Sequence, residues 1–428
     1  MLTITSARAP GSATATAITA VALSALLLTS CAAPPTGPAV SSPDAATTTH
    51  GYVEGAEELS EPELSLALVD RPGTLTLFDL LDGNSSVLPG ESGQVDGMAG
   101  DGRFVYSSRV AGDRTTVDVV DSGRWTVEHG DHFHYYRAAE RAVGTVTGTG
   151  MPAIHTGDRK TAIAFPAVGE VVVLAQDDLA GGTLGDPLTL SRSPHPGLLA
   201  VPFAGHLLVT APDPAGIVAT VEILDERGQT LEAAGMPCPQ ASDAVITRVG
   251  AVVTCADGAV LVTAADGAPV AEKIGYPAGI APPALRLDGR AGRPVVAGAA
   301  DARAGTGRAG FWQLDTRRRE WAFRPTDAPL VAVSAVGDDA GRTVAVDDAG
   351  RIRVFGSDGA DLGTGGPLLA GSTADQVARS RIRLMVDANR AYVSGPVEGL
   401  VLEVDYRDGG RIARTFDGLD PQFFEQVG

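Results

Sequence analysis

Lysine and cysteine are scarce in this chain of 428 residues, which contains two lysines (Lys160 and Lys273) and three cysteines. Glycine and proline are abundant instead, at 53 and 28 residues. Both residue types disfavour the interior of a helix. No stretch keeps its apolar residues at the 3.6-residue spacing of a helix for three turns. The composition therefore excludes a fold built on long helices.

An excess of basic residues is also missing. Lysine and arginine together number 33 against 52 acidic residues, which gives a formal net charge of −19 at pH 7. Because a surface of this sign repels phosphate backbones, we expect no nucleic acid among the partners. The same charge attracts cations and also favours solubility.

Residues 1–30 have the parts of an export signal: an early Arg8, an apolar run over residues 17–28, and small residues after it. The run is shorter than the roughly 20 apolar residues that a membrane-spanning helix needs. It ends in Leu-Thr-Ser-Cys at Cys31, which resembles the lipobox of bacterial lipoproteins. We expect residues 1–30 to be a signal peptide and Cys31 to be lipidated, so that the protein is exported and lipid-anchored to the outer face of the cell membrane. An ordinary cleaved signal peptide is the alternative.

Two further cysteines, Cys238 and Cys255, follow Cys31. An even number of cysteines in an exported chain predicts one disulfide. Half of a metal site is the competing interpretation, but oxidised cysteines cannot bind a metal.

Residues 31–63 are low in large apolar side chains and rich in Pro, Ala, Thr and Glu, so they are expected to form a disordered acidic and Pro-rich tether. Within this segment His50 precedes a run of glutamates at positions 54, 57, 58, 61 and 63. The run is either a solvated linker or a weak cation-binding stretch.

From residue 64 to residue 428 short apolar runs with period-two alternation are separated by Asp-Gly, Gly-Asp or Asn turns. This pattern predicts an all-β domain. About 360 residues of short strands are too many for one sandwich and fit a β-propeller. Comparable units begin near residues 64, 100, 143, 197, 241, 283, 330 and 373, which predicts about eight four-stranded blades, with seven possible.

Histidine is rare, yet six of the seven histidines lie within residues 129–206. His132 and His134 are two residues apart, and on a strand this spacing points both imidazoles to one side. Such a pair can chelate a divalent metal. His129 has the opposite parity and is expected to belong to the turn at Gly130.

His155 and His195 fall on the two blade-like units after the one that holds His134. Since corresponding loops of neighbouring blades converge on a propeller's channel, histidines of these three units can meet there. Zinc suits clustered imidazoles in the absence of a reduced thiol. The side chains of Glu128, Asp131 and Asp158 are candidates for a fourth ligand or for an acceptor that orients a histidine. Hydrogen-bonded histidines without a metal are the alternative.

Several stretches of the chain resemble the AztD zinc metallochaperones, and the resemblance extends from about residue 64 to residue 424. They are SGRWTVEHGDHFHYYRA (122–138), FPAVGEVVVL (165–174), CPQASDAVITRVGAVVTCADGAVL (238–261), YPAG (276–279), GRPVVAGAA (292–300) and VEGLVLEVDY (397–406). The resemblance implies a cell-envelope β-propeller that binds Zn2+ and hands it to the solute-binding protein of a zinc ABC importer.

The resemblance also implies metal ligands. The family's H-x-H pair falls on His132 and His134, and the histidine of its P-H-x-G element falls on His195. One position departs from the family pattern, because Ser242 stands where a histidine is expected after Cys238-Pro239. His155 or Asp243 is expected to substitute for it.

Two other functions fit a propeller. One is a metal-free surface propeller that recognises a protein or a glycan, since a fold does not define a function. The other is a metal-dependent hydrolase that uses a bound water. The chain has no Ser-His-Asp order with a nucleophile elbow, and hydrolytic propeller sites favour carboxylates and amides over histidines. We therefore expect that the protein is not an enzyme.

Overall fold

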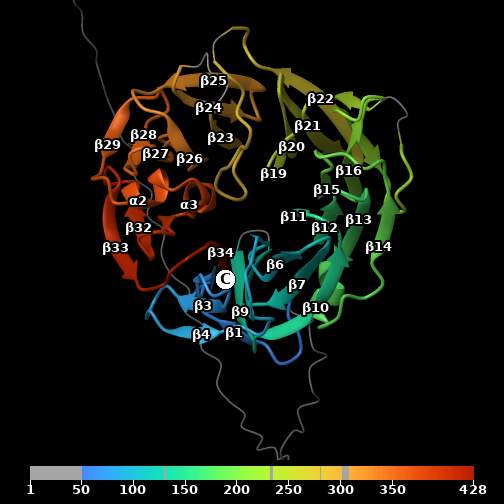
Figure 1. Ribbon diagram of the computed structural model, residues 1–428, viewed down its shortest axis with the longest axis horizontal. Coiled ribbons are helices and arrows are strands. Elements are labelled where there is room, and N and C mark those ends of the chain that lie inside the picture. Colours follow the sequence, from blue (N-terminus) through green and yellow to red (C-terminus); the bar gives the residue numbers. More distant parts are fainter. Residues whose placement is uncertain (1–50, 130–131, 232–234, 280, 301–307) are drawn as a thin grey trace, which may run out of the picture. The chain divides into compact units, whose positions relative to one another are not determined.

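The computed structural model describes residues 51–129, 132–231, 235–279, 281–300 and 308–428. The predicted signal peptide and Cys31 lie outside these residues. Over the described residues the chain forms nine sheets, eight of which are the blades of a propeller (Figure 1). The predicted all-β propeller with eight blades is confirmed. No helix in the described ranges is long and apolar enough to cross a membrane.

The blades follow one another in chain order, and within each blade the strands run outward from the central channel in the order in which they are named. The first blade contains β34 (Phe423–Val427), β2 (Ser65–Val69), β3 (Leu75–Asp79) and β4 (Ser85–Val87), and the second contains β5 (Gly97–Gly100), β6 (Phe104–Ala111), β7 (Arg114–Asp121) and β10 (Arg141–Gly148). The third contains β11 (Ala153–Gly157), β12 (Lys160–Phe165), β13 (Glu170–Ala175) and β14 (Leu188–Ser191), and the fourth contains β15 (Ala200–Phe203), β16 (His206–Pro212), β17 (Val218–Leu224) and β18 (Met236–Pro237).

The fifth blade contains β19 (Asp243–Ile246), β20 (Ala251–Cys255), β21 (Gly258–Ala265) and β22 (Ala268–Gly275), and the sixth contains β23 (Val295–Ala299), β24 (Gly310–Asp315) and β25 (Glu320–Pro325). The seventh contains β26 (Leu330–Ala335), β27 (Thr343–Asp347), β28 (Ile352–Phe355) and β29 (Asp361–Thr364), and the eighth contains β30 (Leu384–Val386), β31 (Ala391–Gly395), β32 (Leu400–Asp405) and β33 (Arg411–Asp417). Three short helices, α1 (Gln176–Ala180), α2 (Ala370–Ala374) and α3 (Gln376–Arg381), lie in connections between strands.

The first blade combines both ends of the domain. Its inner strand β34 comes from the C-terminal end and pairs antiparallel with β2, in a register that runs from Ser65↔Val427 to Val69↔Phe423. The eighth blade therefore meets a first blade that is completed by the last strand of the chain.

The core of the domain is divided among the blade interfaces. In the described residues the buried apolar side chains form eight clusters, one between each pair of neighbouring blades. In β12, for example, Ile163 and Phe165 pack toward the second blade, and Ala162 and Ala164 pack toward the fourth. Both faces of an inner strand are therefore buried. The expected period-two alternation persists in outer strands such as β14, whose burial alternates between half-buried and exposed.

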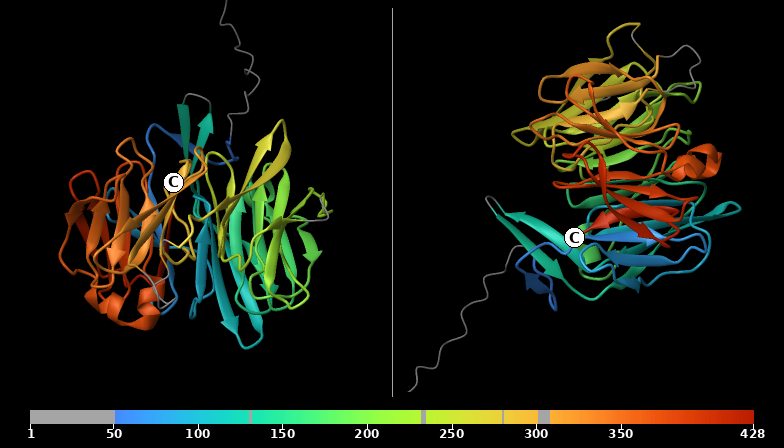
Figure 2. Two further views of the ribbon diagram at one scale, coloured as in Figure 1. Left: turned by 90° about the horizontal axis from the view of Figure 1, so that it is seen from above. Right: turned by 90° about the vertical axis from the view of Figure 1, so that its left-hand side faces the viewer.

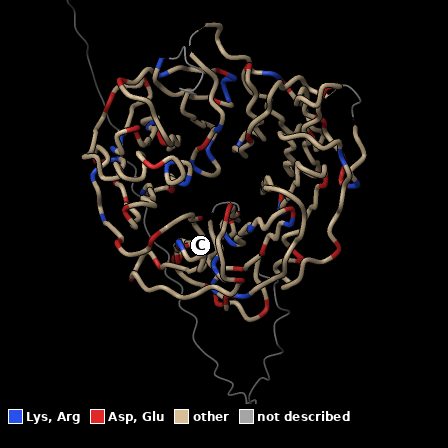
Figure 3. The backbone as a smooth tube through the Cα atoms, viewed as in Figure 1, with Lys and Arg blue, Asp and Glu red and all other residues tan. Residues whose placement is uncertain are grey.

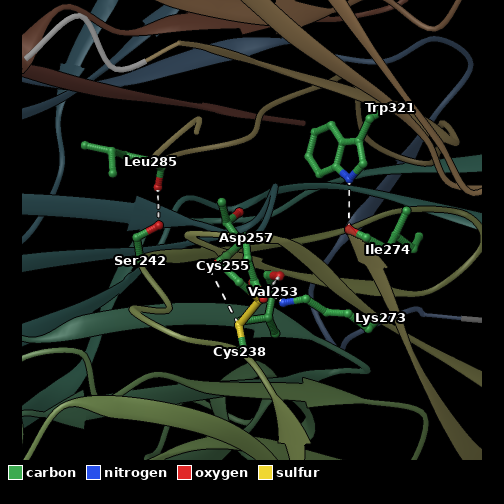
Figure 4. The surroundings of a disulfide bond; sticks show 10 residues. Cys238, Ser242, Val253, Cys255, Asp257, Lys273, Ile274, Leu285 and Trp321 are labelled. Carbon is green, nitrogen blue, oxygen red and sulfur yellow. Dashed lines mark hydrogen bonds and ion pairs between the residues drawn. A yellow bond between two sulfur atoms is a disulfide. The ribbon is translucent and has the colours of Figure 1, made fainter. Parts of the chain in front are cut away.

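A disulfide joins Cys238 to Cys255, as predicted (Figure 4). Cys238 follows β18 of the fourth blade and Cys255 ends β20 of the fifth, and both are buried in the cluster between these blades. The bond therefore links two neighbouring blades covalently. Charged residues of both signs are interspersed over the described part of the chain (Figure 3).

The ninth sheet is not a blade. It contains β1 (Glu57–Leu59), β9 (His132–Arg137) and β8 (Arg124–His129) in that order. Strands β8 and β9 form a hairpin inserted between β7 and β10 of the second blade, which is why the third blade starts at Ala153 and not near residue 143 as predicted. The predicted boundary at residue 64 is also wrong, because β1 lies inside the segment expected to be a disordered tether and pairs with β9.

Candidate metal centre

The β8–β9 hairpin carries the predicted histidine pair and projects beyond the blades (Figure 2). Its register places Val127 opposite His134, and His129 opposite His132.

The imidazoles of His132 and His134 lie side by side. Their Nε2 atoms are 3.1 Å apart, and their ring centroids are 4.8 Å apart. Two nitrogens that bind one tetrahedral zinc ion at its usual bond lengths are separated by about 3.3 Å. The two rings are thus close to the spacing of a chelating pair.

Glu58 on β1 orients one of these rings. Its Oε1 atom lies 2.6 Å from Nδ1 of His134 and accepts a hydrogen bond from it. A neutral imidazole that donates through Nδ1 keeps its lone pair on Nε2. This is the carboxylate–histidine arrangement that fixes the tautomer of metal-binding histidines. The Nε2 lone pair of His134 then faces Nε2 of His132, and a metal ion would lie between these two nitrogens.

Residues 51–59 hold Glu58 in place by contacts along the hairpin. Trp125 Nε1 donates to the carbonyl oxygen of Gly51 at 3.1 Å. A Cβ atom at Gly51, whose φ is +77°, would lie 2.4 Å from a methyl carbon of Val127, so the close approach requires glycine. The Tyr52 ring meets Tyr136 edge-on.

Arg137 on β9 adds an electrostatic contact with β1 and with the segment that follows it. Its guanidinium lies 2.8 Å from Glu57 and 3.4 Å from Glu63. Hydrogen bonding to Glu57, with the charges of Glu63 and Glu57, raises the pKa of Arg137. The pairs are partly exposed, so their contribution to stability is small.

The other predicted ligands lie elsewhere. His155, on the inner strand β11, lines the central channel, where its Nε2 is 3.6 Å from Oδ1 of Asp243. The two side chains expected to substitute for the missing histidine are therefore neighbours. Ser242 itself donates its hydroxyl hydrogen to the carbonyl oxygen of Leu285 at 2.7 Å (Figure 4).

His195 precedes β15 and is buried, with Nε2 hydrogen-bonded to the carbonyl oxygen of Thr210 at 3.3 Å. Burial lowers its pKa. Asp158 accepts a hydrogen bond from the backbone N–H of Gly205. The expected meeting of histidines from three blades is not observed, because the hairpin, an inner strand and a buried loop hold them in different places. Within the described ranges no three His, Cys, Asp or Glu side chains are arranged to hold a metal ion.

Glu58 was not among the residues expected to orient the histidines. Of the candidates for that role, Glu128 is exposed on β8, opposite Phe133, and Asp131 lies outside the described residues. The signal for Glu58 was the run of glutamates before the first blade, which was assigned to the tether.

Eight blades closed by a C-terminal strand, with a hairpin inserted in the second blade, define a β-propeller. No family model and no curated protein sequence matches the chain. Among solved structures, AztD from Citrobacter koseri superposes with a TM-score of 0.70 at 18% identity, covering 85% of this chain and 96% of that one. Apo AztD from the same organism gives 0.68 at 17% identity, covering 85% and 97%.

A more distant solved structure, the dihydro-heme d1 dehydrogenase NirN in complex with DHE, gives a TM-score of 0.50 at 15% identity, covering 86% of this chain and 77% of that one. At these identities the likeness concerns the fold. The AztD-like fold expected from the sequence is confirmed.

Deleting residues 51–59 should loosen the hairpin and leave the ring unchanged. Strand β9 loses its backbone pairing with β1, so its amide hydrogens become less protected, whereas those of β12 keep their partners. Hydrogen–deuterium exchange measured by mass spectrometry checks this, with Glu61→Gln as a control that leaves β1 in place. Equal protection of β9 in the deletion variant would show that β1 does not stabilise the hairpin.

Proposed function

We propose that this chain is an extracytoplasmic metallochaperone that binds zinc and delivers it to the solute-binding protein of a zinc ABC importer. The observation that carries the proposal is the pair of imidazoles on the β8–β9 hairpin, with Nε2 atoms 3.1 Å apart and Nδ1 of His134 held by Glu58. The AztD-like fold supports it. Zinc accepts imidazole nitrogen readily and requires no reduced thiol.

The position of the pair fits a carrier better than a catalyst. His132 is exposed and the side chain of His134 is 17% exposed, so a ligand of a recipient protein can approach the bound ion directly. Transfer then proceeds by exchange of ligands at the hairpin, without opening the blades. No bond of a substrate has to be broken.

The double variant His132→Ala with His134→Ala should lose most of its zinc and keep its fold. Chelation needs both nitrogens, while the eight apolar clusters lie between blades and include neither residue. Zinc per chain, measured by atomic emission, and thermal melting of the metal-free protein check the two halves of this prediction. His206→Ala, a half-buried histidine of β16, is the control. Full zinc retention in the double variant would overturn the assignment of the site.

Glu58→Gln should weaken zinc binding by about 10-fold or more, the usual effect of losing an outer partner of a ligand histidine. The amide keeps the shape of the side chain. It removes the negative charge at Nδ1 of His134 that would stabilise a metal ion bound at Nε2 of the same ring. Competition with a chromophoric chelator measures the affinity. Glu61→Gln, in the same acidic run, is the matched control, and an equal effect of the two changes would mean that general charge is responsible.

The proposal includes an exported chain that is held on the outer face of the cell membrane by a lipid on Cys31. Cys31→Ser should move the protein from the membrane fraction to the soluble fraction. Serine has no sulfur atom to form the thioether through which the lipid would be attached. Its zinc content and melting temperature should not change, because the substitution precedes the propeller. A variant that remains with the membrane would indicate another anchor.

A further inference from the structure

The central channel contains a cavity of about 950 Å³ lined by residues of the inner strands and the segments that lead into them. The charged side chains that line it are Asp101 after β5, Arg286 and Asp288 before β23, Arg379 and Arg383 before β30, Asp387 after β30, and Glu425 on β34. Asp243 on β19 lies within ion-pair distance of Arg286. None of them belongs to the hairpin site.

Arg286 is shared loosely between two carboxylates. Its Nε atom is 3.7 Å from Oδ2 of Asp243, and its Nη2 atom is 3.6 Å from Oδ2 of Asp288. Both distances exceed those of a hydrogen bond. Asp288 also accepts a hydrogen bond from the hydroxyl of Ser334 at 3.3 Å. The charge of Arg286 is thus balanced by neighbours that it does not contact closely.

Arg383 differs from Arg286 in having no ion-pair partner among the described residues, although the charges of Glu425, Asp288 and Asp243 act on it. Among the described residues no carboxylate lies within ion-pair distance of its guanidinium, and its buried Nε atom has no hydrogen-bond partner. Buried polar groups in proteins are nearly always hydrogen-bonded, so an unpartnered guanidinium nitrogen beside a cavity calls for a ligand. A planar guanidinium binds a carboxylate through two parallel hydrogen bonds.

Glu425 provides a second polar group in the same cavity. Burial raises its pKa to about 7, against the opposing effects of Arg383 and Arg286. Near neutral pH a large fraction of this side chain is therefore a neutral acid, which can donate a hydrogen bond to an oxyanion.

Apolar side chains form part of the rest of the wall. Ile154, Val245, Leu285, Val331 and Met385 line the cavity, and Leu285 is 48% exposed. A purely inorganic anion would leave this surface in contact with water. A ligand with a hydrocarbon body would cover it, at a gain of about 25 cal/mol per Å² of apolar surface.

We propose that the central channel binds a small organic monocarboxylic acid, with its carboxylate on Arg383 and its hydrocarbon body against the apolar wall. The protonated side chain of Glu425 donates to the second carboxylate oxygen. Arg286 is engaged by Asp243 and Asp288, whereas Arg383 forms no ion pair in the described residues, so the ligand does not have to displace one. This site is independent of the zinc site.

Isothermal titration of the zinc-free protein with pentanoate tests the proposal. Pentanoate is a poor chelator, so residual metal does not imitate binding. One equivalent should bind, whereas pentanamide, which lacks the charge, and inorganic phosphate, which lacks the hydrocarbon body, should bind far more weakly. Arg383→Gln should weaken pentanoate binding by about tenfold or more, because charge-assisted hydrogen bonds are lost. Arg318→Gln, a change at an exposed arginine outside the cavity, should have no effect.

Glu425→Gln separates this proposal from a general effect of channel charge. The charges of Arg383, Arg286 and Asp288 act on Glu425. His155, Asp101, Arg379 and Asp387 also line the cavity. Wild-type protein should bind pentanoate more tightly at about pH 6 than at about pH 8, since protonated Glu425 is the donor and its ionised form repels the ligand. The glutamine variant should bind with much less dependence on pH.

Absence of pentanoate binding, equal binding of phosphate, or unchanged affinity in Arg383→Gln would each overturn the proposal. Thermal melting of each ligand-free variant shows whether it is folded. If Arg383→Gln does not fold, Arg383→Lys keeps the charge and removes the planar fork. An intermediate loss of affinity in that variant supports the proposal, and wild-type affinity contradicts it.

Discussion

The antiparallel pairing of β34 with β2 is the contact on which the rest of the propeller depends. It completes the first blade with residues from the far end of the domain, and two of the eight apolar clusters include side chains of both strands. Without it the faces of the first and eighth blades that meet at Phe424 would be open to water. The same pairing brings Glu425 into the channel. The strand that closes the ring therefore also supplies a polar side chain to the cavity.

The candidate metal centre depends on a different long-range contact. The two histidines come from one strand, but the carboxylate that orients His134 comes from β1, 76 residues earlier. Gly51 and Trp125 fix that segment on the hairpin. The position of residues 51–59 on the hairpin therefore decides how the imidazole of His134 is oriented.

The sequence predicted what is encoded locally. Strand-length apolar runs, regular turns and the count of repeating units indicated the eight blades, and an even number of cysteines indicated the disulfide. The spacing of His132 and His134 placed both rings on one side of a strand. Glu58 and the contact between His155 and Asp243 could not be predicted, because each joins residues far apart in the chain.

The hairpin leaves and re-enters the second blade at nearly one point, since Asp121 of β7 pairs with Arg141 of β10 and the backbone N–H of Ala138 donates to the carbonyl oxygen of Gly123 at 2.8 Å. A chain that departs and returns at the same place can be lengthened, shortened or replaced there without a change in the register of the blade. The hairpin that carries the histidines can thus be replaced without altering the blades of the propeller. Other binding chemistries could be grafted onto the same propeller at this position.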